Sequence, residues 1–164
     1  MNAKNPIAAL LVLIALCLAP AAQALLTLEK SVSLTDEFGG TLQIQSSGAL
    51  DIPGADITSI ASFSDFHPGA QDRSVNGQVE RQRNRANEQL TSVYSGSLTF
   101  NAVDADGNAR QNVLEFADLT IVRSATGPQF SGAVILNGEV IDAGEMPQQV
   151  AVILRRVLRF FYLA

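Results

Sequence analysis

The feature that most constrains the fold is the alternation of apolar and polar residues between Ser92 and Asp142. Side chains on a β-strand point to opposite faces in turn, so a period of two indicates strands with one buried face. Turn sequences separate the alternating runs at Asp104–Asn108, at Gly127-Pro128 and at Asn137-Gly138. The Asn-Gly pair suits a type I′ hairpin because both central residues take positive φ. The stretch therefore predicts an antiparallel meander.

The preceding part of the chain has the same character with less regularity. Residues 26–45 predict a hairpin, because their apolar residues fall on one parity on either side of a Gly-rich turn. Residues 46–69 are rich in Ser, Gly, Asp and Pro and favour short strands joined by turns. Residues 70–89 are the most polar segment and predict a long exposed loop or the solvated tip of a hairpin.

The end of the chain changes from the strand period to the helix period. Apolar residues recur at helical spacing from Val150 to Phe161, and Pro147 suits a first helical position. A helix over about residues 147–162 is predicted, with a terminal strand as the alternative because the run is rich in Val, Ile and Phe. The predicted fold class is all-β: a single antiparallel β-sandwich or partly open barrel of about seven or eight strands, closed by a C-terminal α-helix.

The first 24 residues have the pattern of a cleaved secretory signal peptide. Lys4 supplies the positive n-region, Ile7–Ala19 is apolar, and Ala22-Gln23-Ala24 is an A-x-A cleavage site. The apolar run is too short to span a bilayer, which takes about 20 residues. Cys17 follows Leu16, where processing of a lipoprotein signal needs a small residue. We therefore expect residues 25–164 to be a single exported domain in the periplasm, the outer envelope or the extracellular space.

Composition excludes several chemistries for this mature domain. It would lack cysteine, which removes thiol nucleophiles and Cys-ligated zinc, and its single histidine removes a His-pair metal site within one chain. Loss of Lys4 leaves 10 basic against 16 acidic residues. An acidic chain is a poor candidate for binding nucleic acid. No cofactor is expected.

The only histidine provides a catalytic hypothesis. His67 lies between Asp65 and Asp72, and an Asp–His pair orients a general base, with Ser62 or Ser64 as the nucleophile. No G-x-S-x-G sequence surrounds either serine. The alternative is a turn residue with its ring in water, which a histidine before Pro-Gly also suits.

Two clusters of charged residues are further candidates for binding sites. Asp104, Asp106, Asn108 and Glu115 match part of an EF-hand register, although Ala109 stands where that loop needs glycine and the flanking segments alternate as strands. An ordinary Asp-Gly hairpin turn accounts for the same residues. In the polar segment, basic side chains that could meet phosphate, an acidic glycan or lipid headgroups form the predicted exposed basic loop. They are Arg81, Arg83 and Arg85.

The predicted helix has two possible roles. It could pack its apolar stripe on the sheet, or its basic and aromatic residues could bind a membrane or another partner. The residues of the second hypothesis are Arg155, Arg156, Arg159, Phe160 and Tyr162.

Three function classes follow from these observations. The first is an exported, non-catalytic binding or envelope-assembly domain, whose partner would be another envelope protein, a glycan or an anionic membrane surface. The second is a carrier that holds an apolar or lipid ligand within the sheet. The third is a hydrolase that uses His67.

Overall fold

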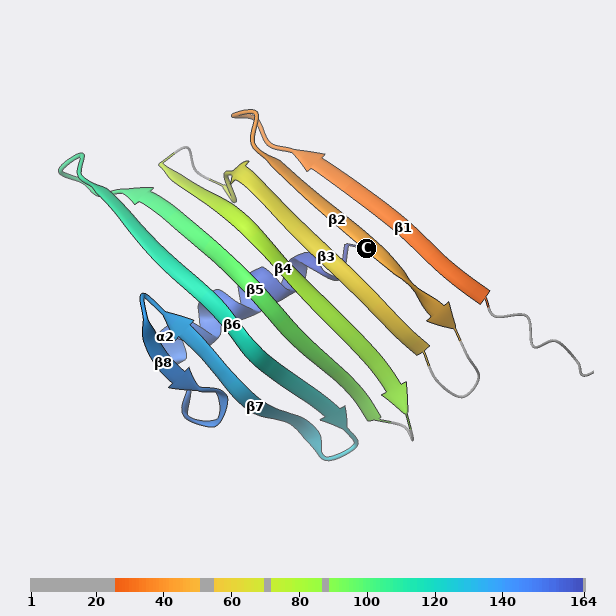
Figure 1. Cartoon of the computed structure of the whole chain (residues 1–164). Helices are drawn as coiled ribbons and strands as arrows, with labels where there is room; N and C mark the ends of the chain where they lie inside the picture. Colours follow the sequence, from red (N-terminus) through yellow and green to blue (C-terminus); the bar gives the residue numbers. More distant parts are fainter. Residues whose placement is uncertain (1–25, 51–54, 70–71, 87–88, 164) are drawn as a thin grey trace, which may run out of the picture.

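A computed structural model describes residues 26–50, 55–69, 72–86 and 89–163, and the predicted signal peptide lies outside these residues. These described residues form eight strands, a 3₁₀ turn and one long helix (Figure 1). The elements in order are β1 (Leu26–Thr35), β2 (Thr41–Leu50), β3 (Ala55–Phe66), β4 (Arg73–Ala86), β5 (Gln89–Val103), β6 (Ala109–Ser124), β7 (Gly127–Leu136), β8 (Glu139–Asp142), η1 (Ala143–Glu145) and α2 (Gln148–Phe160).

The strands form one antiparallel sheet in the order β1 to β8, so each strand pairs with its neighbours in sequence. The predicted hairpin at the start of the chain is confirmed by the pairing of β1 with β2. Asn137 and Gly138 turn β7 into β8 with φ angles of 53° and 85°, as the Asn-Gly signal predicts. Short turns between strands favour this order, because a local antiparallel connection needs only a few residues.

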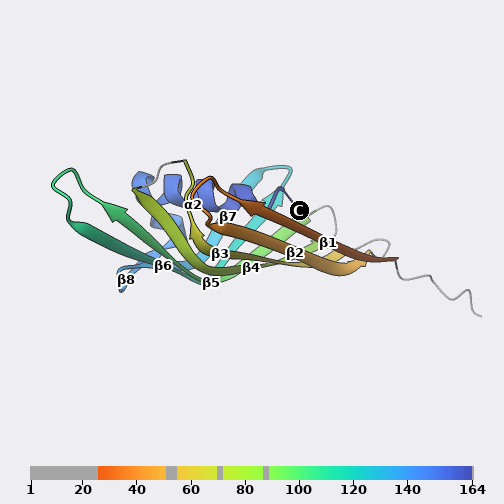
Figure 2. The same cartoon turned by 90° about the horizontal axis from the view of Figure 1, so that it is seen from above.

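The helix α2 lies on one side of the sheet and crosses the strands obliquely (Figures 1 and 2). Its buried side chains are Val150, Leu154 and Val157, followed by Phe161 just after the helix ends. These side chains pack against apolar residues of the sheet. Residues that pair directly across neighbouring strands point to the same side, so they form rows across the sheet. One such row runs across six strands and comprises Ile44, Ala61, Val79, Gly96, Phe116 and Val134.

These observations confirm the predicted all-β fold with a C-terminal helix. The sheet is single and open, and α2 takes the place of a second layer over its apolar side. The helix begins one residue after Pro147, which is its N-cap. We refer below to the side of the sheet that carries α2 as the helix side and to the opposite side as the outer side.

The prediction for residues 70–89 was wrong. Strand β4 covers Arg73–Ala86 and pairs along its length with β3 and β5, and β5 begins at Gln89. The segment is polar because alternate residues such as Gln78 and Gln82 are exposed on the outer side of an open sheet. Its other parity carries Val75 and Val79 in the first half of the strand but Arg81, Arg83 and Arg85 in the second half, so the composition resembles that of a loop.

Candidate functional site

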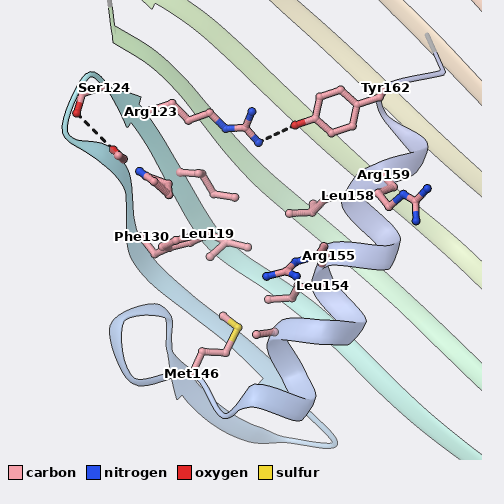
Figure 3. Close-up of a pocket in the computed structure, with 14 residues that line it drawn as sticks. Leu119, Arg123, Ser124, Phe130, Met146, Leu154, Arg155, Leu158, Arg159 and Tyr162 are labelled. Atoms are coloured by element: carbon pink, nitrogen blue, oxygen red, sulfur yellow. Dashed lines mark hydrogen bonds between the residues drawn. The ribbon is translucent and has the colours of Figure 1, made fainter.

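A groove lies between α2 and the strands β6 and β7 (Figure 3). Leu119 and Ile121 on β6 and Leu154 and Leu158 on α2 line it with aliphatic side chains, and its volume is about 580 Å³. This volume falls in the range of small-molecule sites, roughly 300–1,000 Å³. The groove is therefore large enough for a ligand with an apolar part.

The local sequence explains why this space stays open. The β6 residues Leu119 and Ile121 alternate on the helix side and are buried. On β7, Phe130 contributes to the groove but is 49% exposed, because the helix does not reach over it. Met146 lies at the helix start and Tyr162 follows the helix end, so they mark the two ends of the groove in Figure 3.

Three arginines add positive charge to this apolar groove. Arg123 on β6 and Arg155 and Arg159 on α2 all line it and are all exposed. Arg123 donates a hydrogen bond from Nη2 to Oη of Tyr162 at 2.6 Å, and its guanidinium lies 5.9 Å from the tyrosine ring centroid. Within the described residues, none of the three forms a salt bridge. Their charge is thus available to an anionic group in the groove.

Arg81 of β4 lies near the end of the helix, and its side chain is buried. Only 6% of the residue is exposed, and its guanidinium carbon lies 5.0 Å from the ring centroid of Phe161. Nη2 donates a hydrogen bond to Oγ of Ser59 at 3.2 Å, while Nε has no partner among the described atoms. Burial lowers the pKa of Arg81 and the charge of Arg83 adds to this, whereas Tyr94 acts in the opposite direction.

The predicted exposed basic loop is therefore corrected. Arg81, Arg83 and Arg85 lie at alternate positions of a strand, and Arg81 is buried rather than in solvent. Arg83 is half-buried and pairs across the sheet with Ile57 and Ser92, and Arg85 is exposed. All three point to the helix side, because they share the parity of buried Val79.

The five residues predicted to bind a membrane or partner through the helix fall into two groups, one packed and one exposed. Phe160 is half-buried and packs edge-to-face against Phe63 and Phe66, with ring centroids 5.4 and 5.9 Å away, so its ring belongs to the core. Arg155, Arg156 and Arg159 are exposed, and Tyr162 is 63% exposed.

His67 pairs with a residue that sequence reasoning missed. Its Nδ1 lies 3.2 Å from Oδ2 of Asp36 in the β1–β2 turn, and its ring lies against Phe38 with centroids 5.0 Å apart. The backbone N–H of His67 also donates to Asp36. The expected pairing of His67 with Asp65 or Asp72 was wrong: the Asp65 N–H donates to Asn76, and the nearest cation to Asp72 is Arg73 at 3.9 Å.

Asp36 stabilises this junction of two turns as a carboxylate. Burial raises its pKa, but backbone N–H groups of His67, Phe38 and Gly40 and the imidazole of His67 donate to it, so that the pKa is lowered overall. A carboxylate saturated by backbone donors has little capacity to act as a base. Neither Ser62 nor Ser64 forms a hydrogen bond with His67 in the described structure, so the hydrolase arrangement is not assembled.

The possible calcium ligands form a hairpin turn. Asp104 Oδ1 accepts the backbone N–H groups of Asp106 and Asn108, and Oδ2 accepts Arg110. Glu115 lies further along β6, opposite Ser97 on the outer side. In the described ranges, no three His, Cys, Asp or Glu side chains are placed to hold a metal ion together.

Comparison with known proteins adds no assignment. No protein-family model matches the chain, and the searches of curated proteins and of solved structures also found no match. Among the described residues, no helix is long and apolar enough to span a bilayer.

Proposed function

We propose that the protein is a non-catalytic binding protein whose groove holds an anionic amphiphile, that is, an apolar chain with a carboxylate or phosphate head. The observation that carries this proposal is the combination of an aliphatic floor with three arginines that form no salt bridge to any described residue. Guanidinium groups form charge-assisted hydrogen bonds with carboxylates and phosphates.

The shape of the groove fits the apolar part of such a ligand. Leu119, Ile121 and Leu158 offer a surface whose contact with an alkyl chain is worth about 0.8 kcal/mol for each CH₂ removed from water. Arg155 and Arg159 lie one helical turn apart and both line the groove, so their long side chains can approach the same head group.

Export remains part of the proposal. The signal-peptide pattern of residues 1–24 favours a periplasmic or other envelope location for this binding protein. A binding role also agrees with the arrangement around His67, whose partner Asp36 serves two turns rather than a reactive serine.

The test is calorimetric titration of the mature chain with laurate and with uncharged dodecanol as probes. We expect laurate to bind, and the double variant Arg155→Gln/Arg159→Gln to weaken laurate binding by at least about tenfold. Binding of dodecanol should change little, because its hydroxyl does not need the charge.

Arg156→Gln is the matched control. Arg156 is exposed on the same helix but does not line the groove, so this variant should bind laurate like the parent protein. Absence of laurate and dodecanol binding in the parent protein would refute the proposed function. Equal laurate affinity of the parent and the double variant would show that the arginines do not recognise the head group.

A further inference from the structure

The basic residues in the described part of this acidic protein all lie on the same side of the sheet. Of the 11 basic residues in the sequence, ten lie in the described part of the chain. Three are on α2, and the other seven occupy strand positions that share the parity of the buried core residues on the helix side. The seven are Lys30, Arg73, Arg81, Arg83, Arg85, Arg110 and Arg123.

Strand pairing establishes this placement. Lys30 pairs with Ser46, which pairs with Ser59, then Arg81 and then Tyr94, so the row points to one side. Arg85 pairs with Leu90 and through it with Arg123. Paired residues point to the same face of a sheet. These cations therefore all lie on the helix side and are not divided between the two sides.

The acidic residues are placed differently. Within the described strands, five acids outside bulges point to the outer side: Glu29, Asp56, Glu80, Glu115 and Asp142. Glu139, at the end of β8, is the exception, because it pairs with Leu136. The other described acids lie in turns, bulges or η1. The sheet thus separates charge across its thickness, although the whole chain has a formal net charge of −5.

Most of these cations have no acidic partner in the part of the chain that the structure describes. Arg73 and Arg110 lie within 4 Å of Asp72 and Asp104, and the described structure shows no salt bridge for the other eight. Large apolar side chains are also exposed on or beside the helix: Val152 (42%), Tyr162 (63%) and Leu163 (45%). An exposed surface that combines arginines with aromatic and aliphatic side chains matches the interface of an anionic bilayer.

We propose that the helix side docks the protein peripherally on an anionic lipid bilayer, with the acidic outer side facing away. Basic residues near such a surface are attracted to the anionic head groups, and added salt weakens this attraction by screening it. The separation of charge sets the orientation, because the acidic side is repelled when the basic side is attracted. Docking goes beyond ligand binding and does not require an occupied groove.

The experiment is co-sedimentation of the mature chain with vesicles. The vesicles contain phosphatidylcholine alone or with about 30% phosphatidylglycerol, at about 50 mM salt, where screening is moderate. We expect binding to the anionic vesicles only, and release at about 500 mM salt. Binding to both vesicle types, or to neither, would overturn the proposal.

Two triple variants separate the helix side from net charge. Arg83→Gln/Arg85→Gln/Arg156→Gln removes cations that do not line the groove, and we expect it to lower the partition coefficient at least tenfold. The matched control adds the same negative charge on the outer side through exposed residues and should keep most of the binding. It is Gln43→Glu/Gln45→Glu/Gln78→Glu.

The outcomes distinguish this inference from the proposed function. Equal loss of binding in the two variants would mean that net charge alone governs attraction, which overturns an oriented docking face. Far-ultraviolet circular dichroism checks that each variant is folded, and the salt release of the unmodified protein tests the docking without any variant. Laurate titration of the first triple variant should give the parent affinity, so a failure of docking does not imply a failure of the groove.

Discussion

At the scale of single residues, Asp36 connects the β1–β2 turn to the end of β3. Its carboxylate accepts backbone N–H groups of Phe38 and Gly40 within its own turn and of His67 from the other segment. These donors are fixed by the backbone, so they favour the ionised carboxylate and lower its pKa although burial raises it. The ionised form is therefore the one that holds the two turns together.

This arrangement predicts a loss of stability in acid. Because the folded pKa of Asp36 lies below the ordinary 3.8, its contribution is present above about pH 4 and is lost as the pH falls through the folded pKa. Asp36→Asn should lower stability at neutral pH and make the acid limb shallower. Urea titrations of both proteins between about pH 2 and 7 measure this difference. Parallel stability–pH curves would contradict the assignment.

Arg81 is a buried cation, which is unusual for an arginine without an acidic partner among the described residues. Its guanidinium is buried with one hydrogen bond to Ser59 and the face of Phe161, and no described carboxylate neutralises it. Burial of a charge that lacks an opposite charge is unfavourable, and its replacement by an apolar side chain of similar size is often neutral or stabilising.

We expect Arg81→Met to leave the free energy of unfolding unchanged or to raise it by about 1–2 kcal/mol, because the uncompensated charge is removed while the volume is kept. Chemical denaturation measures this quantity. Arg73→Met is the control on the same strand, where the side chain is 68% exposed, and should have almost no effect. A loss above about 2 kcal/mol in Arg81→Met would show that the cation itself stabilises the helix end.

At the scale of elements, α2 is held by one apolar stripe. Leu154 is 5% exposed in the middle of this stripe, whereas Val152 on the opposite flank is 42% exposed. The helix has no side-chain N-cap, since Pro147 occupies that position, so its stability depends on packing against the sheet.

Leu154→Ala should therefore destabilise the protein by about 2–5 kcal/mol, since it leaves a cavity between helix and sheet. Val152→Ala is the matched control and should change stability by less than about 0.5 kcal/mol. Denaturant unfolding measures both variants. Equal effects of the two substitutions would mean that the stripe is not the face that packs on the sheet.

Strand β4 is an element whose local sequence does not indicate a strand. Its outer parity is polar, and its helix-side parity has Val75 and Val79 followed by three arginines, so the apolar alternation that indicates a strand stops halfway along it. Its hydrogen bonds come from β3 and β5, which lie on both sides of it. Only the assembled sheet supplies those partners, and a tertiary context of this kind overrides local composition.

At the scale of the whole molecule, alternation, the Asn137-Gly138 turn and the helical spacing after Pro147 were sufficient to predict an all-β antiparallel chain with a C-terminal helix. These signals are local, because side-chain period and turn chemistry depend on neighbours in sequence. They also identified the arginines and tyrosine of the helix as candidates for binding.

Tertiary structure alone decided which of these residues meet. The groove combines β6, β7 and α2, His67 pairs with Asp36 from a turn 31 residues away, and Arg81 lies against Phe161. Strand register determines which charges share a side, and register depends on pairing between strands rather than on any one strand. The sequence by itself thus determined the class of fold and its elements, whereas the groove and the separation of charge follow from how the strands pair and where the helix packs.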